Sequence, residues 1–301
     1  AKTVTLNGVL LDTTNYSLVS QPNSTTANIS KANVTISSVL VNNKVYDTTT
    51  NASIGSAVAT VALGNATAAN GTVLTQAFNN FTESAVFANA SAGSNKTVNL
   101  NASLADSANY TVVAQPSSAT ANISQAQVTV TSAVVNNKVF DTTTNASVNV
   151  SSATVNLGNA SAANGATVTQ AFTNYTESAS FANASAGVNK TVNINAVLTD
   201  TTNYTVASQP ANTTANISQA QVTIASVLVN DKVYDTTTNA SLNSTSATVA
   251  LGNASAANGS TTSQSFSNYT ESASFANASA GSTKAVNVNA VLADSTNYTI
   301  V

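Results

Sequence analysis

The chain has 301 residues, of which 43% are apolar but only 6% are charged, and its formal net charge is −3. Cys, His, Met, Trp and Arg are absent, so disulfides, thiolate nucleophiles, the common zinc and copper ligands and the usual general base are excluded. All eight basic residues are Lys, and no apolar run is long enough to cross a bilayer. We therefore expect no enzyme activity, no cofactor or metal, no nucleic-acid partner and no membrane insertion in this segment.

A Lys-Val-aromatic-Asp motif recurs without insertion or deletion at a spacing of 94 residues, and an Asn-Tyr pair recurs at the same spacing. Such regular self-similarity predicts tandem copies of one domain. We expect residues 1–31 to be the C-terminal part of a preceding repeat or a donor-strand segment. The three repeats are then 32–125, 126–219 and 220–301, and the third lacks its last strand.

Within each repeat, apolar residues alternate with polar ones, which is the period of a β-strand. Gly64-Asn65, Asn70-Gly71 and Gly93 mark turns, Pro116 precedes the last strand, and Ala66–Ala69 allows one helical turn at most. Six or seven short strands in 94 residues favour an all-β fold of tandem immunoglobulin-like β-sandwiches in an elongated rod. In repeat 1 the expected strands are marked, in chain order, by Val34 and Ile36, Val61 and Leu63, Phe78, Phe87, Val98 to Leu104, Tyr110 to Val113, and Thr120 to Ile123.

The Lys-Val-Tyr-Asp motif is interpreted as structural, with its ring packed at a strand end and its Asp capping the Thr-rich turn that follows. The alternative is a binding epitope, although such a site is not normally duplicated in every repeat. The residues assigned to the structural motif are Lys44, Tyr46, Asp47, Lys138, Phe140, Asp141, Lys232, Tyr234 and Asp235, together with Tyr110, Tyr204 and Tyr298 of the Asn-Tyr pairs.

Further residues of each repeat extend the pattern. In repeat 1 they are Lys44-Val45-Tyr46-Asp47, Phe87, Gly93, Lys96-Thr97-Val98, Leu104, Asp106, Asn109-Tyr110 and Thr120-Ala121-Asn122-Ile123. With these residues each unit resembles the YDG-type repeat of bacterial filamentous-haemagglutinin-like surface adhesins. Thr48, Thr142 and Thr236 stand where that family has Gly, which is unfavourable if the turn requires a positive φ. The resemblance implies a cell-surface adhesin stalk with no catalytic site.

The sequon Asn-x-Ser/Thr occurs 29 times among 43 Asn. With Ser and Thr at 87 of 301 positions, about 12 would arise by chance. The excess favours covalent N-linked glycans, and the alternative is an unmodified polar surface. The candidate glycosylation sites are Asn51, Asn65, Asn89, Asn145, Asn159, Asn183, Asn239, Asn253 and Asn277.

Glu83, Glu177 and Glu271 recur in register and could serve as the acid of an intramolecular Lys–Asn isopeptide bond. The alternative is an exposed salt bridge of little energetic value. Calcium binding between repeats would need clustered acids, whereas those of this chain are scattered singly.

The leading functional hypothesis is a structural stalk or spacer of an extracellular, cell-surface adhesin or fibre. One alternative is a filament subunit that polymerises head to tail, residues 20–31 of one chain completing the open repeat of the next by β-strand addition. Another is that the repeats bind glycan or host protein, which an aromatic content of 5% disfavours. The expected partners are neighbouring repeats of the same or identical chains.

Overall fold

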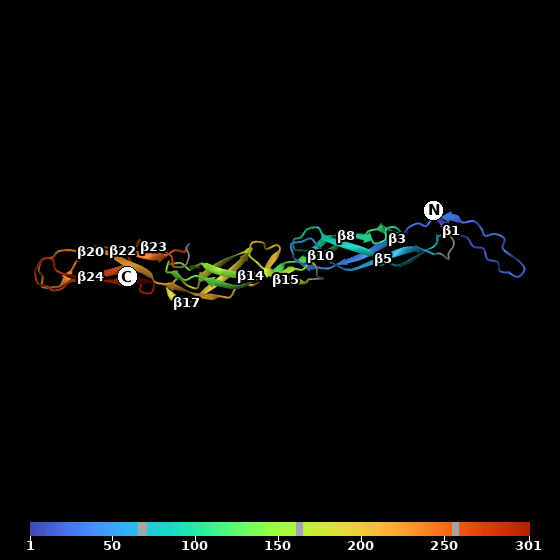
Figure 1. The fold of residues 1–301 in the computed structure, drawn as a ribbon. Helices are drawn as coiled ribbons and strands as arrows, with labels where there is room; N and C mark the ends of the chain where they lie inside the picture. The colour runs from blue at the N-terminus through green and yellow to red at the C-terminus, as the bar shows by residue number, and fades with distance from the viewer. Residues whose placement is uncertain (66–70, 161–164, 255–258) are drawn as a thin grey trace. The chain divides into compact units, whose positions relative to one another are not determined.

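The computed structural model describes residues 1–65, 71–160, 165–254 and 259–301, and within those residues it consists of β-strands, turns and loops without an α-helix (Figure 1). The all-β prediction is therefore confirmed. Ala66–Ala69, the place of the expected helical turn, lies outside the described residues. The described part of the chain also contains no helix that could span a membrane.

By its contacts the chain divides into two compact units, and each is described by itself. The first contains Ala1–Gln125 with Gly158–Val168, and the second contains Ala126–Leu157 with Thr169–Val301. The terms repeat 1, repeat 2 and repeat 3 denote residues 32–125, 126–219 and 220–301.

Repeat 1 contains two four-stranded sheets. Its strands are β3 (Ala32–Val41), β4 (Lys44–Val45), β5 (Ile54–Gly64), β6 (Val73–Ala77), β7 (Phe81–Phe87), β8 (Gly93–Leu104), β9 (Tyr110–Ala114) and β10 (Ala119–Ser124). The sheet orders are β6-β5-β3-β9 and β4-β10-β8-β7. The β3–β9 and β4–β10 pairs are parallel, and the other pairs are antiparallel.

Alternation of side chains explains why these segments become strands. In β3, Val34 and Ile36 are buried while their neighbours Asn33 and Thr35 are exposed. Both sheets contribute to the buried clusters of repeat 1, because Val34 packs with Ala102 of β8 in one of them. Phe78, expected within a strand, lies one residue beyond β6, where its N–H donates to the Ala59 carbonyl at 3.0 Å.

Repeat 2 has the same plan with one additional short strand. Its sheet orders are β15-β14-β11-β18 and β12-β19-β17-β16-β13. The strands are β11 (Ala126–Val135), β12 (Lys138–Val139), β13 (Asn145–Ala146), β14 (Val148–Gly158), β15 (Thr167–Ala171), β16 (Tyr175–Phe181), β17 (Gly187–Leu198), β18 (Tyr204–Ser208) and β19 (Thr213–Ser218).

Repeat 3 has a complete first sheet, β23-β22-β20-β26, but its second sheet, β21-β24-β25, has three strands. Its described residues supply no strand in the places that β12 and β19 occupy in repeat 2. The strands are β20 (Ala220–Val229), β21 (Asn239–Ala240), β22 (Leu242–Gly252), β23 (Thr261–Ser265), β24 (Tyr269–Phe275), β25 (Val286–Leu292) and β26 (Tyr298–Ile300).

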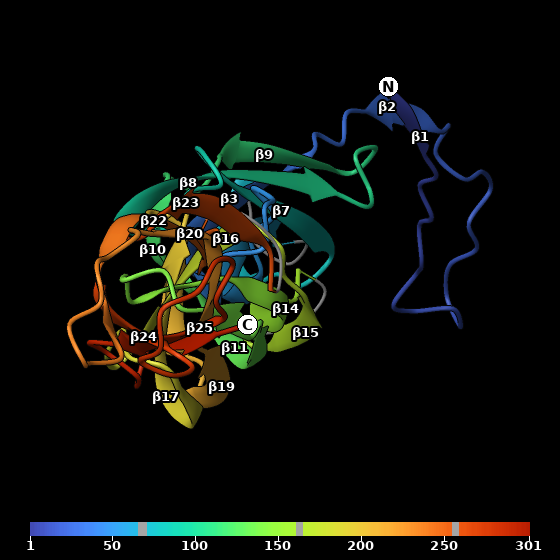
Figure 2. The same ribbon diagram turned by 90° about the vertical axis from the view of Figure 1, so that its left-hand side faces the viewer.

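The segment before repeat 1 forms a small antiparallel pair, β1 (Lys2–Val4) with β2 (Thr25–Ala27). Every residue of these two strands is exposed, and a long loop connects them away from the sheets of repeat 1 (Figure 2). Ile29, just beyond β2, has 82% of its surface exposed. The segment therefore has no buried core of its own.

A Gln side chain supplies hydrogen bonds near the C-terminal end of β8, the longest strand of repeat 1. Gln115 lies between β9 and β10, and its Oε1 accepts from the Ala102 N–H at 3.0 Å while its Nε2 donates to the Ala102 carbonyl at 3.1 Å. Gln209 makes the same pair of bonds to Ala196 in repeat 2. The Gln115 side-chain amide thus makes the two hydrogen bonds that a neighbouring strand would otherwise make, because β10 does not extend this far along β8.

Gln115→Ala should lower the free energy of unfolding of repeat 1 by about 1–3 kcal/mol, because it leaves two backbone groups of the buried Ala102 without partners. Urea unfolding followed by circular dichroism would measure the loss. Gln21→Ala is the matched control, since Gln21 makes the same two bonds to Gly8 within the exposed N-terminal segment. Equal effects of the two changes would contradict this account.

Candidate functional site

A single carboxylate oxygen organises the turn that follows β4. Asp47 Oδ1 accepts from Lys44 Nζ at 2.6 Å and from both the N–H and the hydroxyl of Thr49 at 2.9 Å. Lys44 Nζ also donates to the Thr49 carbonyl at 2.8 Å. The Lys, the Asp and the second Thr after it therefore close one compact turn.

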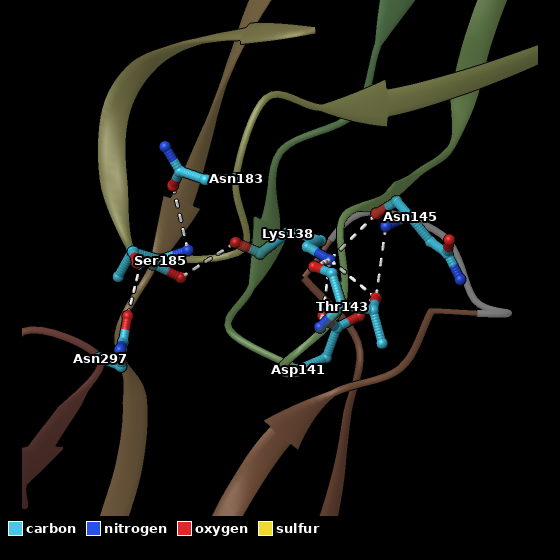
Figure 3. Close-up of polar contacts among 9 residues, drawn as sticks. Lys138, Asp141, Thr143, Asn145, Asn183, Ser185 and Asn297 are labelled. Carbon is cyan, nitrogen blue, oxygen red and sulfur yellow. Dashed lines mark hydrogen bonds and ion pairs between the residues drawn. The ribbon is translucent and has the colours of Figure 1, made fainter. Parts of the chain in front are cut away.

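The same network recurs in each repeat. In repeat 2, Lys138 donates to Asp141 Oδ1 at 2.6 Å and to the carbonyls of Thr143 and Asn145 (Figure 3). In repeat 3, Lys232 donates to Asp235 Oδ1 at 2.7 Å. Each ammonium also lies 5.5–5.6 Å from the centre of a Phe ring, a distance at which a cation–π contact adds to the ion pair. The rings belong to Phe87, Phe181 and Phe275.

The first Thr of each turn adopts the left-handed conformation in which Gly is normally found. The φ angles of Thr48, Thr142 and Thr236 are 68°, 67° and 67°. A β-branched residue in this region costs about 1–3 kcal/mol. The turn thus has a positive φ at which a Gly would be unstrained, and the hydrogen bonds of the adjacent Asp stabilise this conformation.

The Lys-Val-aromatic-Asp motif also contacts the repeat that follows it. In the first unit, the Gly158 N–H at the end of β14 donates to the Tyr46 carbonyl at 2.8 Å. A Cβ added to Gly158 would lie only 2.0 Å from the Val45 carbonyl oxygen, so only glycine permits this approach. In the second unit the geometry is the same: the Gly252 N–H donates to the Phe140 carbonyl at 2.9 Å, and a Cβ added to Gly252 would lie 2.0 Å from the Val139 carbonyl oxygen.

Apolar packing continues across this junction in the second unit. One buried cluster combines Phe140, Phe181 and Ile217 of repeat 2 with Ala220 and Val222 of repeat 3. Repeats 2 and 3 therefore share a core at their junction. Further contacts are the edge-on rings of Phe140 and Tyr298, 5.3 Å apart, and the Ala186 N–H that donates to Asn297 Oδ1 at 2.8 Å.

The Tyr residues of the Asn-Tyr pairs form part of the packing inside the repeats. Tyr110, Tyr204 and Tyr298 are half-buried and lie 4.8–5.0 Å, between ring centres, from Phe78, Phe172 and Phe266. These contacts support a structural role for the pairs.

The three recurrent Glu residues do not lie with a Lys–Asn pair. Glu83 is on β7 opposite Ala102, and burial raises the pKa of its carboxyl. The Lys–Asn contacts are formed elsewhere: in repeats 1 and 2 a Lys near the start of β8 or β17 donates its Nζ to the Oδ1 of an Asn in the preceding loop, and the cognate Lys of repeat 3 does the same. These pairs are Lys96–Asn89, Lys190–Asn183 and Lys284–Asn277. The isopeptide hypothesis thus has Lys–Asn pairs without its proposed acid beside them.

Glu177 and Glu271 instead line shallow grooves of about 420 and 570 Å³, beside Tyr175 and Tyr269 respectively. One oxygen of Glu177 and both oxygens of Glu271 are buried and have no hydrogen-bond partner. No group of acidic residues among the described residues is arranged to hold a metal ion.

The candidate glycosylation sites mostly have exposed side chains. Asn65 and Asn159 are half-buried, and both lie directly after a long strand. The exposed sites are Asn51, Asn89, Asn145, Asn183, Asn239, Asn253 and Asn277. Their accessibility is compatible with modification, which stays a prediction.

The comparisons with known proteins agree with the repeat pattern. The family described as the YDG domain matches residues 30–120, 124–213 and 218–301. No curated protein and no solved structure matches the chain.

Gly158→Ala should destabilise the junction of the first unit by about 1–3 kcal/mol, because the new Cβ would overlap the Val45 carbonyl oxygen. We expect faster hydrogen exchange at residues 158–160 and 165–168 and an earlier urea transition. Gly64→Ala is the matched control, since Gly64 ends β5 as Gly158 ends β14, yet nothing lies within 4 Å of its Cβ position. An unchanged Gly158→Ala protein would disprove the docking role.

Acidification should open the turn of repeat 3 only at very low pH. The hydrogen bond from Lys232, followed by those from Thr237, lowers the pKa of Asp235 from 3.8 to about 2. Because the folded-state pKa is depressed, the stabilisation is complete above the ordinary value and is lost as the pH falls through about 2. NMR titration of the Thr237 amide should show that midpoint, and Lys232→Gln should move it upward. A wild-type midpoint near 3.8 would contradict the network.

Proposed function

Because the chain belongs to the YDG domain family, of which it contains three tandem copies, we propose that it is a structural spacer of an extracellular fibre or cell-surface adhesin of the filamentous-haemagglutinin type. In this proposal each repeat is an immunoglobulin-like β-sandwich, and successive repeats form an elongated rod outside the cell. The rod provides length, stiffness and resistance to pulling.

The observation that carries this proposal is the repeated junction. The end of one long strand docks on the Lys-Val-aromatic-Asp motif of the preceding repeat through Gly158 in one unit and through Gly252 in the other. A spacer requires such nearest-neighbour coupling, because each shared contact resists bending between repeats. Cognate residues make the same contacts at both junctions, as expected for a feature that is duplicated with every repeat.

The exposed sequons support an extracellular location. With charged residues at 6% of the chain, attached glycans would supply solubility and shield the sheet edges from association. The grooves beside Glu177 and Glu271 favour a second candidate, glycan binding by the repeats themselves. Their half-buried Tyr rings are groups that can stack on a sugar. A glycan array that detects binding abolished by Tyr175→Ala and Tyr269→Ala would establish this alternative.

Antibodies against repeat 2 should label intact, unpermeabilised cells of the source organism, because a spacer of a surface fibre is outside the envelope. Protease treatment of intact cells should remove the label, and a cytosolic protein should stay unlabelled as the control. The residue 1–301 portion released from the surface should have a mass above 30.1 kDa that falls on deglycosylation.

Label that appears only after permeabilisation would refute the surface spacer. A mass at the sequence value would refute the glycan coat while leaving the spacer itself intact. A deficit of about 17 Da for each repeat would instead establish isopeptide bonds, since each releases one ammonia.

A further inference from the structure

One edge of the first sheet of each repeat lacks the features that keep a β-sheet from pairing with another chain. The edge strand is β6 in repeat 1, β15 in repeat 2 and β23 in repeat 3, and in the described part of the chain each has a strand on one side only. Every residue of these three strands is exposed. An exposed edge strand is a template for a further strand unless charge, Pro, a bulge or a covering segment prevents it.

The other sheet edges of repeat 1 have such protection. The register of β9 shifts between Val112 and Ala114, and Pro116 follows two residues after the strand. The edge of β7 is covered through the bridge between Asn51 and Val86, and β13 and β21 cover the cognate strands of repeats 2 and 3. The remaining edge strand, β4, is only two residues long. The edge of β6 is therefore the exception.

The strand β6 is regular, uncharged and partly apolar. Its five residues, Val-Leu-Thr-Gln-Ala, pair with β5 without a register shift. No charged residue and no Pro occurs between Asp47 and Glu83. Val73 and Leu74 are 58% and 48% exposed, so the edge also presents apolar surface. β15 and β23 are equally free of charge but less apolar, with the sequences Thr-Val-Thr-Gln-Ala and Thr-Thr-Ser-Gln-Ser.

The backbone groups at the free edge belong to alternate residues of β6. At one end of the strand the Thr72 carbonyl accepts from the residue after β5 at 2.8 Å, and at the other end the Phe78 N–H donates to a carbonyl of β5 at 3.0 Å. Because the direction of these groups alternates along a strand, the even-numbered residues between them also face β5. The N–H and C=O groups of Val73, Thr75 and Ala77 therefore point to the free edge.

We propose that β6 of one chain pairs antiparallel with β6 of a second copy and thereby joins two chains side by side. Full overlap of the five residues places Thr75 opposite its own copy and Val73 opposite Ala77. The residues of each facing pair would exchange two backbone hydrogen bonds, and Val73 would pack against the Ala77 methyl group. A second copy fits this edge because the strand carries no charge, so two identical strands meet without repulsion.

The size of the interface sets the strength of this pairing. The interface is isologous, since both chains contribute the same strand, and it closes as a pair. Two strands of this length bury less surface than a standard protein interface of about 1,600 Å². We therefore expect pairing at micromolar to millimolar concentrations. Pairing through β15 should be weaker, and through β23 weaker still, because the apolar content of the strands falls in that order.

The proposal rests on the proposed spacer function and adds its lateral partner, a second copy of the spacer. Its failure is separable from failure of the spacer, because a chain whose β6 stays unpaired leaves the Gly158 junction and the surface labelling unaffected. Sequons at Asn65 and Asn80 lie on either side of β6, so glycans attached there would hinder pairing. The experiments therefore use the 1–301 chain produced without glycans.

The absence of Cys from the chain permits a direct test by cross-linking. In the paired strands the Cα atoms of Thr75 and its copy would lie about 5.5 Å apart, which is within the range of a disulfide. Thr75→Cys should therefore form a covalent dimer under mild oxidation at least about tenfold faster than Thr35→Cys. Thr35 is the matched control, since it is exposed in the same sheet but lies on the interior strand β3. Equal rates would overturn the proposal.

Val73→Cys and Ala77→Cys test the register of the pairing. Neither variant should cross-link with itself as fast as Thr75→Cys, whereas a mixture of the two should form a mixed dimer, because these positions face each other in the paired strands. A mixture that forms no mixed dimer would overturn the antiparallel pairing of β6 with its copy.

Sedimentation equilibrium of the cysteine-free chain measures the same pairing without a covalent bond. Thr75→Lys should weaken self-association at least about tenfold, because it places two like charges opposite each other. Thr75 is exposed, so this variant should fold normally. Thr35→Lys adds the same charge away from the edge and should associate as the unchanged chain does. A chain that stays monomeric at millimolar concentration, or that associates equally well with Lys at either position, overturns the proposal.

Discussion

The junctions between repeats depend on one Asp oxygen that accepts three hydrogen bonds. A Thr with φ near 68° costs about 1–3 kcal/mol. A hydrogen bond to a charged group contributes about 1.5–3 kcal/mol, so three bonds to Asp47 Oδ1 outweigh that strain. With the turn held, the Tyr46 carbonyl accepts from the Gly158 N–H of the following repeat, and the Val45 carbonyl lies against the same glycine. Local electrostatics thereby determine how repeats join.

The turn has the same geometry whether its surface is covered or exposed. In repeat 3, where Val233 and Tyr234 are largely exposed, Lys232 still contacts Asp235 at 2.7 Å and Thr236 still has a φ of 67°. In repeat 1, the Asp47 side chain of the same network is 4% exposed, against 51% for Asp235. Docking therefore covers a preformed surface, and little conformational entropy is lost when two repeats meet.

Alternation of apolar and polar residues was sufficient to predict the all-β fold, and strands such as β3 and β8 lie where it indicated. The pattern could not predict β4, because two residues carry no periodicity and the strand exists only through its parallel partner β10, about 80 residues later. The sequence pattern predicted a turn at Gly64, whose cognates are Gly158 and Gly252. Their role in close approach depends on a neighbouring repeat, which no local pattern reveals.

The few charged residues of the chain have structural roles that their positions explain. Asp residues mostly hold turns, either in the Lys-linked network or by accepting the backbone N–H and side-chain amide of an Asn three residues later. Three Lys close the network, and three others contact an Asn in a loop. Because these charged side chains stabilise turns and loops, the surface is hydrated mainly through neutral Asn, Thr and Ser. Solubility of a long array then depends on those residues and on whatever is attached to them, which links the composition to the proposed glycan coat. The Asp residues that bind an Asn in this way are Asp12, Asp106, Asp200 and Asp294.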